Sequence, residues 1–311
     1  MADVRMSYSE PLAEGWRWMV EMLFRPFNIG KWLVIAFAAW LAGLAGGGGG
    51  GGGNARGSWD IDNPDEMGGV IRHGWNWLMS DEAMAGMIFA AVLTVIAIVL
   101  IVLWVSSRGK FIFLDNVVHN RAAIAEPWRR YKKIGNSLFL FRLIAGLLCL
   151  PLALGVVGLF AWLAFGPDGW VHLGGAASAA GIVGTATLAF VVGVAALYVV
   201  FFLDAFVVPL MFHYDLGVMD AWRRFGLLFA ANKGSFLLCG LFVFVLCVLA
   251  AIAVMVTGVM TCCLGFMLLV LPYVGTAVLL PLIVTYRAFT VAFLAQLDPE
   301  LALTAAVDPA S

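Results

Sequence analysis

The sequence predicts an all-α polytopic membrane protein with six transmembrane helices, arranged as three repeats of a cytoplasmic amphipathic helix and a helical hairpin. Three observations predict this fold. Hydrophobic residues make up 63% of the chain and charged residues 12%, against roughly half and a quarter in soluble domains. Apolar runs of membrane-spanning length recur along all 311 residues. A short stretch that combines an acid, a tryptophan and an arginine occurs three times, each time before such a run.

The repeated stretch reads HNRAAIAEPWRR at 119–130 and HYDLGVMDAWRR at 213–224, and more weakly SYSEPLAEGWRW at 7–18. Tryptophan favours the depth of the lipid head groups, and arginine pairs with lipid phosphate. We therefore expect three surface helices, at about 9–25, 122–133 and 217–231. The residues expected at the head groups are Trp16, Arg17, Trp128, Arg129, Arg130, Trp222, Arg223 and Arg224.

The first surface helix has both a start and a stop signal. Ser9 can cap it and Pro11 suits its first turn, while apolar side chains recur at helical spacing up to Leu23. Pro26 then turns the chain. The first span follows at about 29–45, and Lys31 near its start must snorkel to the interface.

The other spans are expected at about 83–105, 138–165, 176–203, 236–256 and 264–294. The helix of the second span should continue through residues 111–114, which are apolar. A kink is expected at Pro151 in the third span. The last span contains Pro272 and Pro281.

The distribution of charge predicts the orientation by the positive-inside rule. One set of loops carries most of the cations, namely Arg5, Arg17, Arg25, Lys31, Arg108, Lys110, Arg121, Arg129, Arg130, Lys132, Lys133, Arg223, Arg224 and Lys233. The other set carries Arg56 and Arg72 among acids, namely Asp60, Asp62, Asp65, Glu66, Asp81, Glu82 and Asp168. We expect a bacterial cytoplasmic membrane protein with both termini in the cytoplasm. The chain would be a single domain with repeats at about 7–114, 115–212 and 213–296, and a tail at 297–311.

Eight glycines at 46–53 open an extracytoplasmic loop that ends near residue 82. They predict a flexible linker, or else a close-packed segment whose carbonyls face a pore. The loop is acidic and aromatic, and residues 70–79 favour a helix. The cysteines lack metal-ligand spacing and are interpreted as small apolar filler, although Cys262 and Cys263 could form a strained vicinal disulfide.

Two sets of polar residues are candidates for function. His119, Glu126, His213 and Asp220 could form an anion or head-group site, or they could be ordinary interface residues, with His119 paired to Asp115 four residues earlier. Ionisable residues also lie inside apolar runs, where charges are costly. We expect Asp204 to pair with Arg142 or Arg287, as a structural clasp or as part of a proton or ion pathway.

The motifs also carry a family resemblance. The stretch VPLMFHYDLGVMDAWRR at 208–224 with NKGSF at 232–236, and FRPFNIG at 24–30 before the glycines, resembles an uncharacterised group of bacterial multi-pass membrane proteins. That group is similar to the membrane domain attached to some glycerophosphoryl diester phosphodiesterases. The resemblance implies a six-helix membrane fold and supplies no catalytic residues. A phosphodiesterase barrel of roughly 250 residues would not fit in this chain.

The functional interpretation has three alternatives. A non-enzymatic scaffold or assembly subunit, oligomeric or part of a membrane complex, fits the large apolar body. A transporter or channel for ions or small solutes fits the repeats, the prolines and the embedded charges. A lipid head-group-binding protein or enzyme would depend on His119 and His213. The sequence shows no catalytic, metal or phosphate-loop motif, so we expect no cofactor and no enzyme activity, and a net charge of −1 gives no reason to expect nucleic acid.

Overall fold

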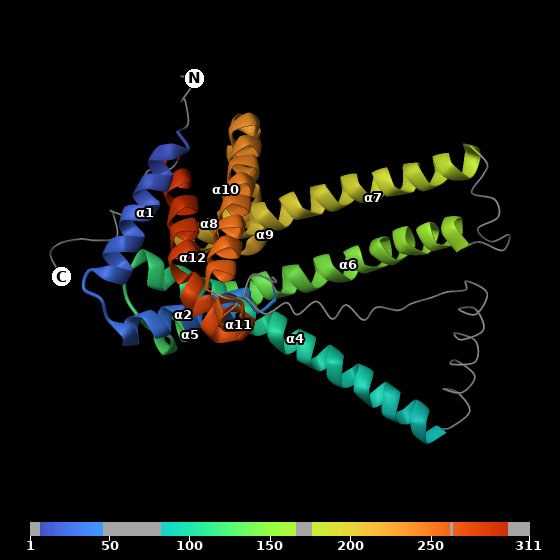
Figure 1. Cartoon of the computed structure of the whole chain (residues 1–311), viewed down its shortest axis with the longest axis horizontal. Coiled ribbons are helices and arrows are strands. Elements are labelled where there is room, and N and C mark those ends of the chain that lie inside the picture. The colour runs from blue at the N-terminus through green and yellow to red at the C-terminus, as the bar shows by residue number, and fades with distance from the viewer. Residues whose placement is uncertain (1–6, 46–81, 166–175, 262–263, 298–311) are drawn as a thin grey trace. The chain divides into compact units, whose positions relative to one another are not determined.

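The computed structural model describes residues 7–45, 82–165, 176–261 and 264–297, and these residues fold into helices without strands (Figure 1). The predictions for the glycine run, the acidic segment, Cys262–Cys263 and the tail lie outside these residues. Five helical segments are long and apolar enough to cross a membrane. They are Gly86–Val118, Lys132–Val156, Val183–Tyr214, Lys233–Met260 and Tyr273–Ala295.

The chain divides into two compact units. The first contains residues 1–53, 102–141 and 198–311, and the second contains residues 54–101 and 142–197. The helices α4 (Glu82–Val118), α6 (Lys132–Phe165) and α7 (Ala176–Phe202) each contribute residues to both.

In the first unit, α1 (Ser9–Phe24) packs along α12 (Pro272–Ala295), and α2 (Ile29–Gly43) contacts the same helix. A side chain at Gly15 would lie only 2.9 Å from the main-chain nitrogen of Phe289, so the first contact needs a glycine. A side chain at Gly109 of α4 would place its Cβ atom only 2.7 Å from main-chain atoms of Leu41 and Ala42. Both glycines allow close helix packing of the kind common in membrane proteins.

The predicted surface helices are found in part. The first matches α1, and the third matches α9 (Val218–Ala231). The second was predicted too long, because α5 (Ala125–Arg130) has six residues and α6 begins at Lys132. Tyr131 separates the two helices, and its hydroxyl donates a hydrogen bond to Asp115 of α4.

The predicted spans also need two corrections. The first span corresponds to α2, whose 15 residues extend about 22 Å, short of the roughly 30 Å hydrocarbon core. The last span is divided into α11 (Leu264–Val270) and α12, because Leu271 precedes a proline and adopts an extended backbone. By contrast, α6 continues through Pro151 and α12 continues through Pro281, and the kink at Pro151 stays a prediction. Helix α4 continues through residues 111–114, as predicted, and ends at Val118.

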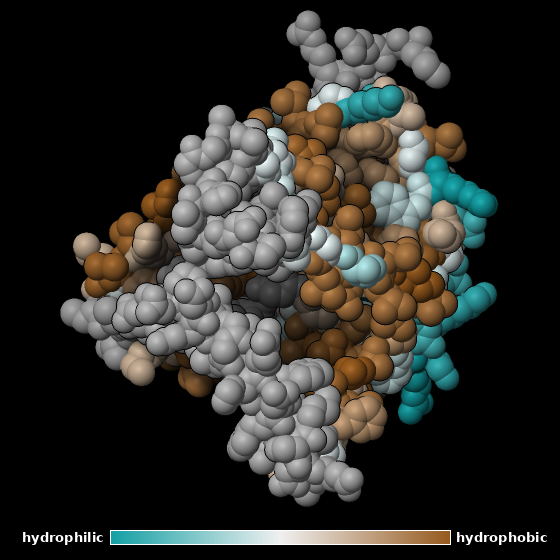
Figure 2. Space-filling view, turned by 90° about the vertical axis from the view of Figure 1, so that its right-hand side faces the viewer, coloured by the Kyte–Doolittle hydropathy of each residue, from teal (hydrophilic) through white to brown (hydrophobic). Residues whose placement is uncertain are grey.

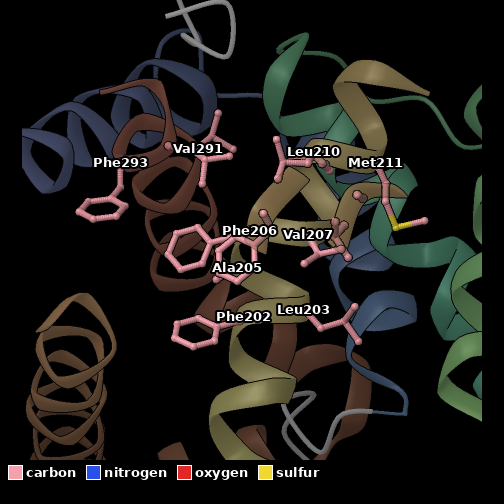
Figure 3. Packing of buried hydrophobic residues seen from close by; sticks show 14 of the residues in the cluster. Phe202, Leu203, Ala205, Phe206, Val207, Leu210, Met211, Val291 and Phe293 are labelled. Atoms are coloured by element: carbon pink, nitrogen blue, oxygen red, sulfur yellow. The ribbon is translucent and has the colours of Figure 1, made fainter. Parts of the chain in front are cut away.

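After α7 the helix continues as a π-helical segment η2 (Leu203–Val207) and then as α8 (Val208–Tyr214). Most of the apolar side chains of these two segments belong to the larger hydrophobic cluster. Figure 3 shows Phe206 of η2 facing α12, where its ring lies 5.8 Å from that of Phe293. Helix α10 (Lys233–Met260) adds Phe236, whose ring lies 5.1 Å from that of Phe206. The free cysteine Cys239 is buried there as apolar filler.

The described helices of the second unit present apolar side chains outward. Leu147 and Leu148 of α6 and Leu197 of α7 are each about 70% exposed. The hydroxyl groups of Thr94 and Thr187 donate to the carbonyl one turn earlier in their own helix. On the face drawn in Figure 2, most of the described surface is hydrophobic. These surfaces suit a lipid environment.

Candidate functional site

Three charged side chains from three helices meet inside the first unit. The Nζ atom of Lys110, on α4, donates to the carboxylate of Asp204 in η2. A guanidinium nitrogen of Arg287, on α12, donates to the main-chain carbonyl of the same aspartate. Lys110 and Arg287 are buried, and the Asp204 side chain is 31% exposed. We call these three residues the charged junction.

The π turn explains how Asp204 accepts both donors. In a regular α-helix the amide of Val208 would donate to the carbonyl of Asp204. Here it donates to Leu203, one residue further back, so the Asp204 carbonyl can accept from Arg287. Single π turns within α-helices are frequent at functional sites.

The junction corrects the sequence-based pairing. Asp204 and Arg287 do meet, but their hydrogen bond uses the main chain of Asp204, and its carboxylate contacts Lys110. The sequence-based orientation counted Arg108 and Lys110 among the loop cations, whereas both are buried on α4. Their position on the cytoplasmic side stays a prediction. The predicted continuation of this helix past residue 110 was the signal that could have placed them. Arg142 belongs to the second unit, and its pairing with Asp204 stays a prediction.

A second polar cluster surrounds Asp115, which is fully buried near the end of α4. Its carboxylate accepts hydrogen bonds from the Tyr131 hydroxyl at 2.9 Å and from Nε of Arg121 at 2.9 Å. Nδ1 of His119 lies 3.2 Å from the carboxylate, which confirms the predicted pair of Asp115 and His119. Arg121 also bonds Glu126 at 2.8 Å. We call these five residues the Asp115 cluster.

The electrostatics of the Asp115 cluster follow from these contacts. The hydrogen bond to Asp115 raises the pKa of His119, and partial burial opposes this effect. Burial raises the pKa of the Tyr131 hydroxyl, and the negative charge of Asp115 adds to the rise. The pKa of Arg121 is also raised, because its hydrogen bonds to Asp115 and Glu126 outweigh the cost of burial. At neutral pH the arrangement favours a charged Arg121, a neutral Tyr131 and a His119 that is protonated more readily than a free histidine.

A third arrangement surrounds Arg108, whose guanidinium carbon lies 4.2 Å from the ring centre of Trp104 and 5.3 Å from that of Trp128. Cation–π contacts of this kind favour arginine in a partly desolvated site. Nη2 of Arg108 donates to the side-chain oxygen of Asn136 at 2.9 Å. Trp128, predicted to lie at the head groups, therefore packs on an arginine of α4.

The model of one protein family, described as a family of unknown function (DUF7544), matches residues 10–307. The chain belongs to the DUF7544 family. Searches of curated proteins and of solved structures each find no match. The DUF7544 match gives no link to the membrane domains of glycerophosphoryl diester phosphodiesterases, so that resemblance stays a prediction.

The remaining predicted head-group residues of this DUF7544 protein lie in different surroundings. Trp16, Arg17, Arg129 and Arg130 are exposed. Trp222 is partly buried against Phe141 and Phe225. Two arginines of α9 have partners, since Arg223 lies 3.7 Å from Asp220 and Arg224 stacks 3.7 Å from the Tyr214 ring centre. Their role at lipid head groups stays a prediction.

The predicted site of His119, Glu126, His213 and Asp220 is not assembled as one cluster. His119 and Glu126 both reach the Asp115 cluster, whereas His213 is exposed against Tyr214 and Asp220 pairs with Arg223. Across the described parts of the chain, no three His, Cys, Asp or Glu residues are grouped to hold a metal ion. Glu126, Arg129 and Arg130 line an open groove of about 660 Å³ that could accept an anion.

Proposed function

We propose that this DUF7544 protein is a non-enzymatic scaffold or assembly subunit of a bacterial cytoplasmic membrane. The observation that carries the proposal is the charged junction. Lys110 and Arg287 each donate a hydrogen bond to Asp204, from helices that lie 94 residues before it and 83 residues after it in the sequence. Buried charges that are held in this way fix the geometry of a helix bundle, as breaking such a pair is strongly destabilising.

We also propose that the chain has six spans in three repeats, with both termini in the cytoplasm. The short helix α2 would be the first span, in addition to the five long apolar segments. Matched positions support the repeats. Lys110, Asp204 and Arg287 begin the similar segments KFIF, DAFV and RAFT. Nine residues after them stand His119, His213 and Gln296. The charged junction would then join the same position of each repeat, as expected if the second helices of the hairpins surround a common axis.

The scaffold proposal predicts a stable assembly larger than one chain. Mass photometry of the full chain in lipid nanodiscs should give particles that contain more than one 33.4 kDa chain, or this chain with membrane partners at fixed stoichiometry. Lys110→Met should reduce the assembly, whereas Leu148→Ala, at an exposed apolar position of α6, should not. Particles with one chain and no partner, in nanodiscs and after mild extraction from native membrane, would refute the proposal.

A transporter or channel is the second candidate, because a π turn coincides with an embedded charge and Nε of Arg287 is buried without a hydrogen-bond partner among the described residues. Such a donor could bind a passing anion. Liposomes that contain the chain should then show ion or proton flux above that of empty liposomes, and Asp204→Asn should change it. Equal flux with and without protein would exclude this alternative for the ions tested.

A further inference from the structure

A groove between α1 and α10 has features that the proposed scaffold role does not use. It has a volume of about 640 Å³ and is lined almost entirely by apolar atoms. Its lining residues are Ser9, Leu12, Ala13, Trp16 and Arg17 from α1, and Phe242 and Leu246 from α10. The volume falls within the roughly 300–1,000 Å³ typical of sites for small molecules. Because α10 is long and apolar enough to cross a membrane, lipid chains can reach the groove.

The residues of α1 fall on three faces of the helix. One face is buried and includes Pro11, Gly15, Met19 and Met22. The second face lines the groove. The third is a charged stripe of Glu10, Glu14, Arg17 and Glu21, spaced i, i+4, i+7 and i+11, which brings them onto one side of the helix. Arg17 belongs to both the groove and the stripe, so its positive charge lies at the edge of the apolar groove.

Arg17 differs from its counterpart in the third repeated stretch. Arg223 follows Trp222 as Arg17 follows Trp16, and it lies 3.7 Å from Asp220. No carboxylate among the described residues lies within ion-pair distance of the Arg17 guanidinium, although Glu14 and Glu21 are one turn away on either side. The exposed guanidinium can therefore receive an external anion, and the flanking carboxylates can receive a cation beside it.

We propose that this groove binds a phospholipid whose head group carries a phosphate and a primary ammonium. One acyl chain lies along the apolar lining between α1 and α10. The phosphate accepts hydrogen bonds from Arg17, a geometry for which guanidinium is well suited. The ammonium donates to the carboxylate of Glu14 or Glu21. The alternation of one cation between acids matches a zwitterionic head group and disfavours a lipid with negative charge alone.

The ammonium also separates this lipid from one with a quaternary amine. Phosphatidylcholine carries the same charges as phosphatidylethanolamine but has no N–H to donate to a carboxylate. Phosphatidylglycerol has the phosphate without any cation, and the three acids of the stripe would repel it. The expected order of binding is phosphatidylethanolamine first, phosphatidylcholine second and phosphatidylglycerol last.

Native mass spectrometry of the delipidated full chain, with the three lipids at matched acyl chains, tests the proposal. The wild type should retain one phosphatidylethanolamine per chain. Arg17→Gln should weaken retention at least about tenfold, the effect of losing a charge-assisted contact. Ala13→Phe, at an exposed position of the lining, should weaken retention of all three lipids by filling the groove. Glu14→Gln should reduce the preference for phosphatidylethanolamine over phosphatidylcholine.

Arg223→Gln is the matched control, because it removes an exposed arginine from the same motif on α9 and should leave retention unchanged. Equal losses for Arg17→Gln and Arg223→Gln would overturn the proposal. So would tighter retention of phosphatidylglycerol than of phosphatidylethanolamine. A delipidated chain that forms dimers, which Ala13→Phe separates, would show that a second copy occupies the groove instead. Thermal unfolding of each variant verifies that the fold is kept.

Discussion

The two compact units differ in where charged side chains are buried and where apolar side chains are exposed. The first unit buries charged side chains, such as Lys110 and Asp115, and gives each a partner from another element. The described helices of the second unit expose large apolar side chains, such as Leu148 and Leu197. Lipid tails are as apolar as leucine, so exposure of these groups costs little, whereas an unpaired charge costs a great deal. The specificity of the fold should therefore lie in the polar contacts and close helix crossings of the first unit.

The sharpest test uses two leucines of one helix. Leu138 of α6 is fully buried in the first unit, and Leu148 of the same helix is 69% exposed in the second. Leu138→Ala should lower the free energy of unfolding by about 3 to 4 kcal/mol, because it removes contacts and leaves a cavity. Leu148→Ala should change it by about 0.5 kcal/mol or less. Denaturant unfolding in mixed micelles measures both, and equal effects would contradict the comparison.

The charged junction should show the next largest effect. Asp204→Ala removes the carboxylate that faces the buried Lys110, and should cost about 3 kcal/mol, the low end for a broken buried pair because Asp204 is partly exposed. The double variant Lys110→Met with Asp204→Leu should recover most of this loss, since it removes both charges. The same micelle unfolding experiment measures the coupling. Additive losses would mean that the two side chains do not stabilise each other.

Close helix packing is expected to matter at Gly109 of the first unit and not at Gly146 of the second. Gly109→Ala should cost about 2 kcal/mol, because the new methyl group would lie 2.7 Å from backbone atoms of α2. Gly146→Ala, in the second unit, meets no atom within 4 Å. It should be neutral or stabilising by up to about 1 kcal/mol, since alanine favours a helix more than glycine. Thermal unfolding in nanodiscs distinguishes the pair, and a destabilised Gly146→Ala would be the contrary result.

The smallest effect is expected at His119. The hydrogen bond to Asp115 raises the pKa of His119 in the folded chain. The stability that the protonated ring contributes is therefore fully present below about pH 6.5, the ordinary pKa of histidine, and is lost as the pH rises through the raised pKa. His119→Gln should lower stability by less than about 1 kcal/mol, because 37% of the side chain is exposed. Melting at pH about 5.5 and about 8.5 should show a larger loss at the lower pH. His213→Gln is the control, and a loss independent of pH would oppose the interpretation.

The sequence predicted those parts of the fold that depend on local pattern. Apolar spacing gave α1 and α9 close to their observed bounds, and the continuation of α4 was expected from the apolar residues after 110. The pair of Asp115 and His119 was predictable because one helical turn separates the residues. Each of these features depends on residues within one element.

The sequence did not predict the contacts that join elements far apart. Lys110 was grouped with loop cations, and no local pattern in the sequence predicts that Asp204, 94 residues later, is its partner. The π turn that frees a carbonyl for Arg287 depends on the packing of three helices. The contact of Arg108 with Trp128 of α5 also joins separate elements, whereas Trp104 lies one turn away on the same helix as Arg108. Hydrophobic periodicity identifies which side of a helix is apolar, but it does not identify the neighbour.

The π turn at 203–207 sets the rotational orientation of α8 about the helix axis. A π turn accommodates one more residue than an α turn, and an α-helix rotates by about 100° for each residue. If one residue of this segment were deleted, the turn could relax to an α-helix, and Pro209 to Tyr214 would swing to another side of the axis relative to the part of α7 before it. Insertions and deletions in this segment would thus change the rotation of α8 about the helix axis, whereas substitutions would leave that rotation unchanged.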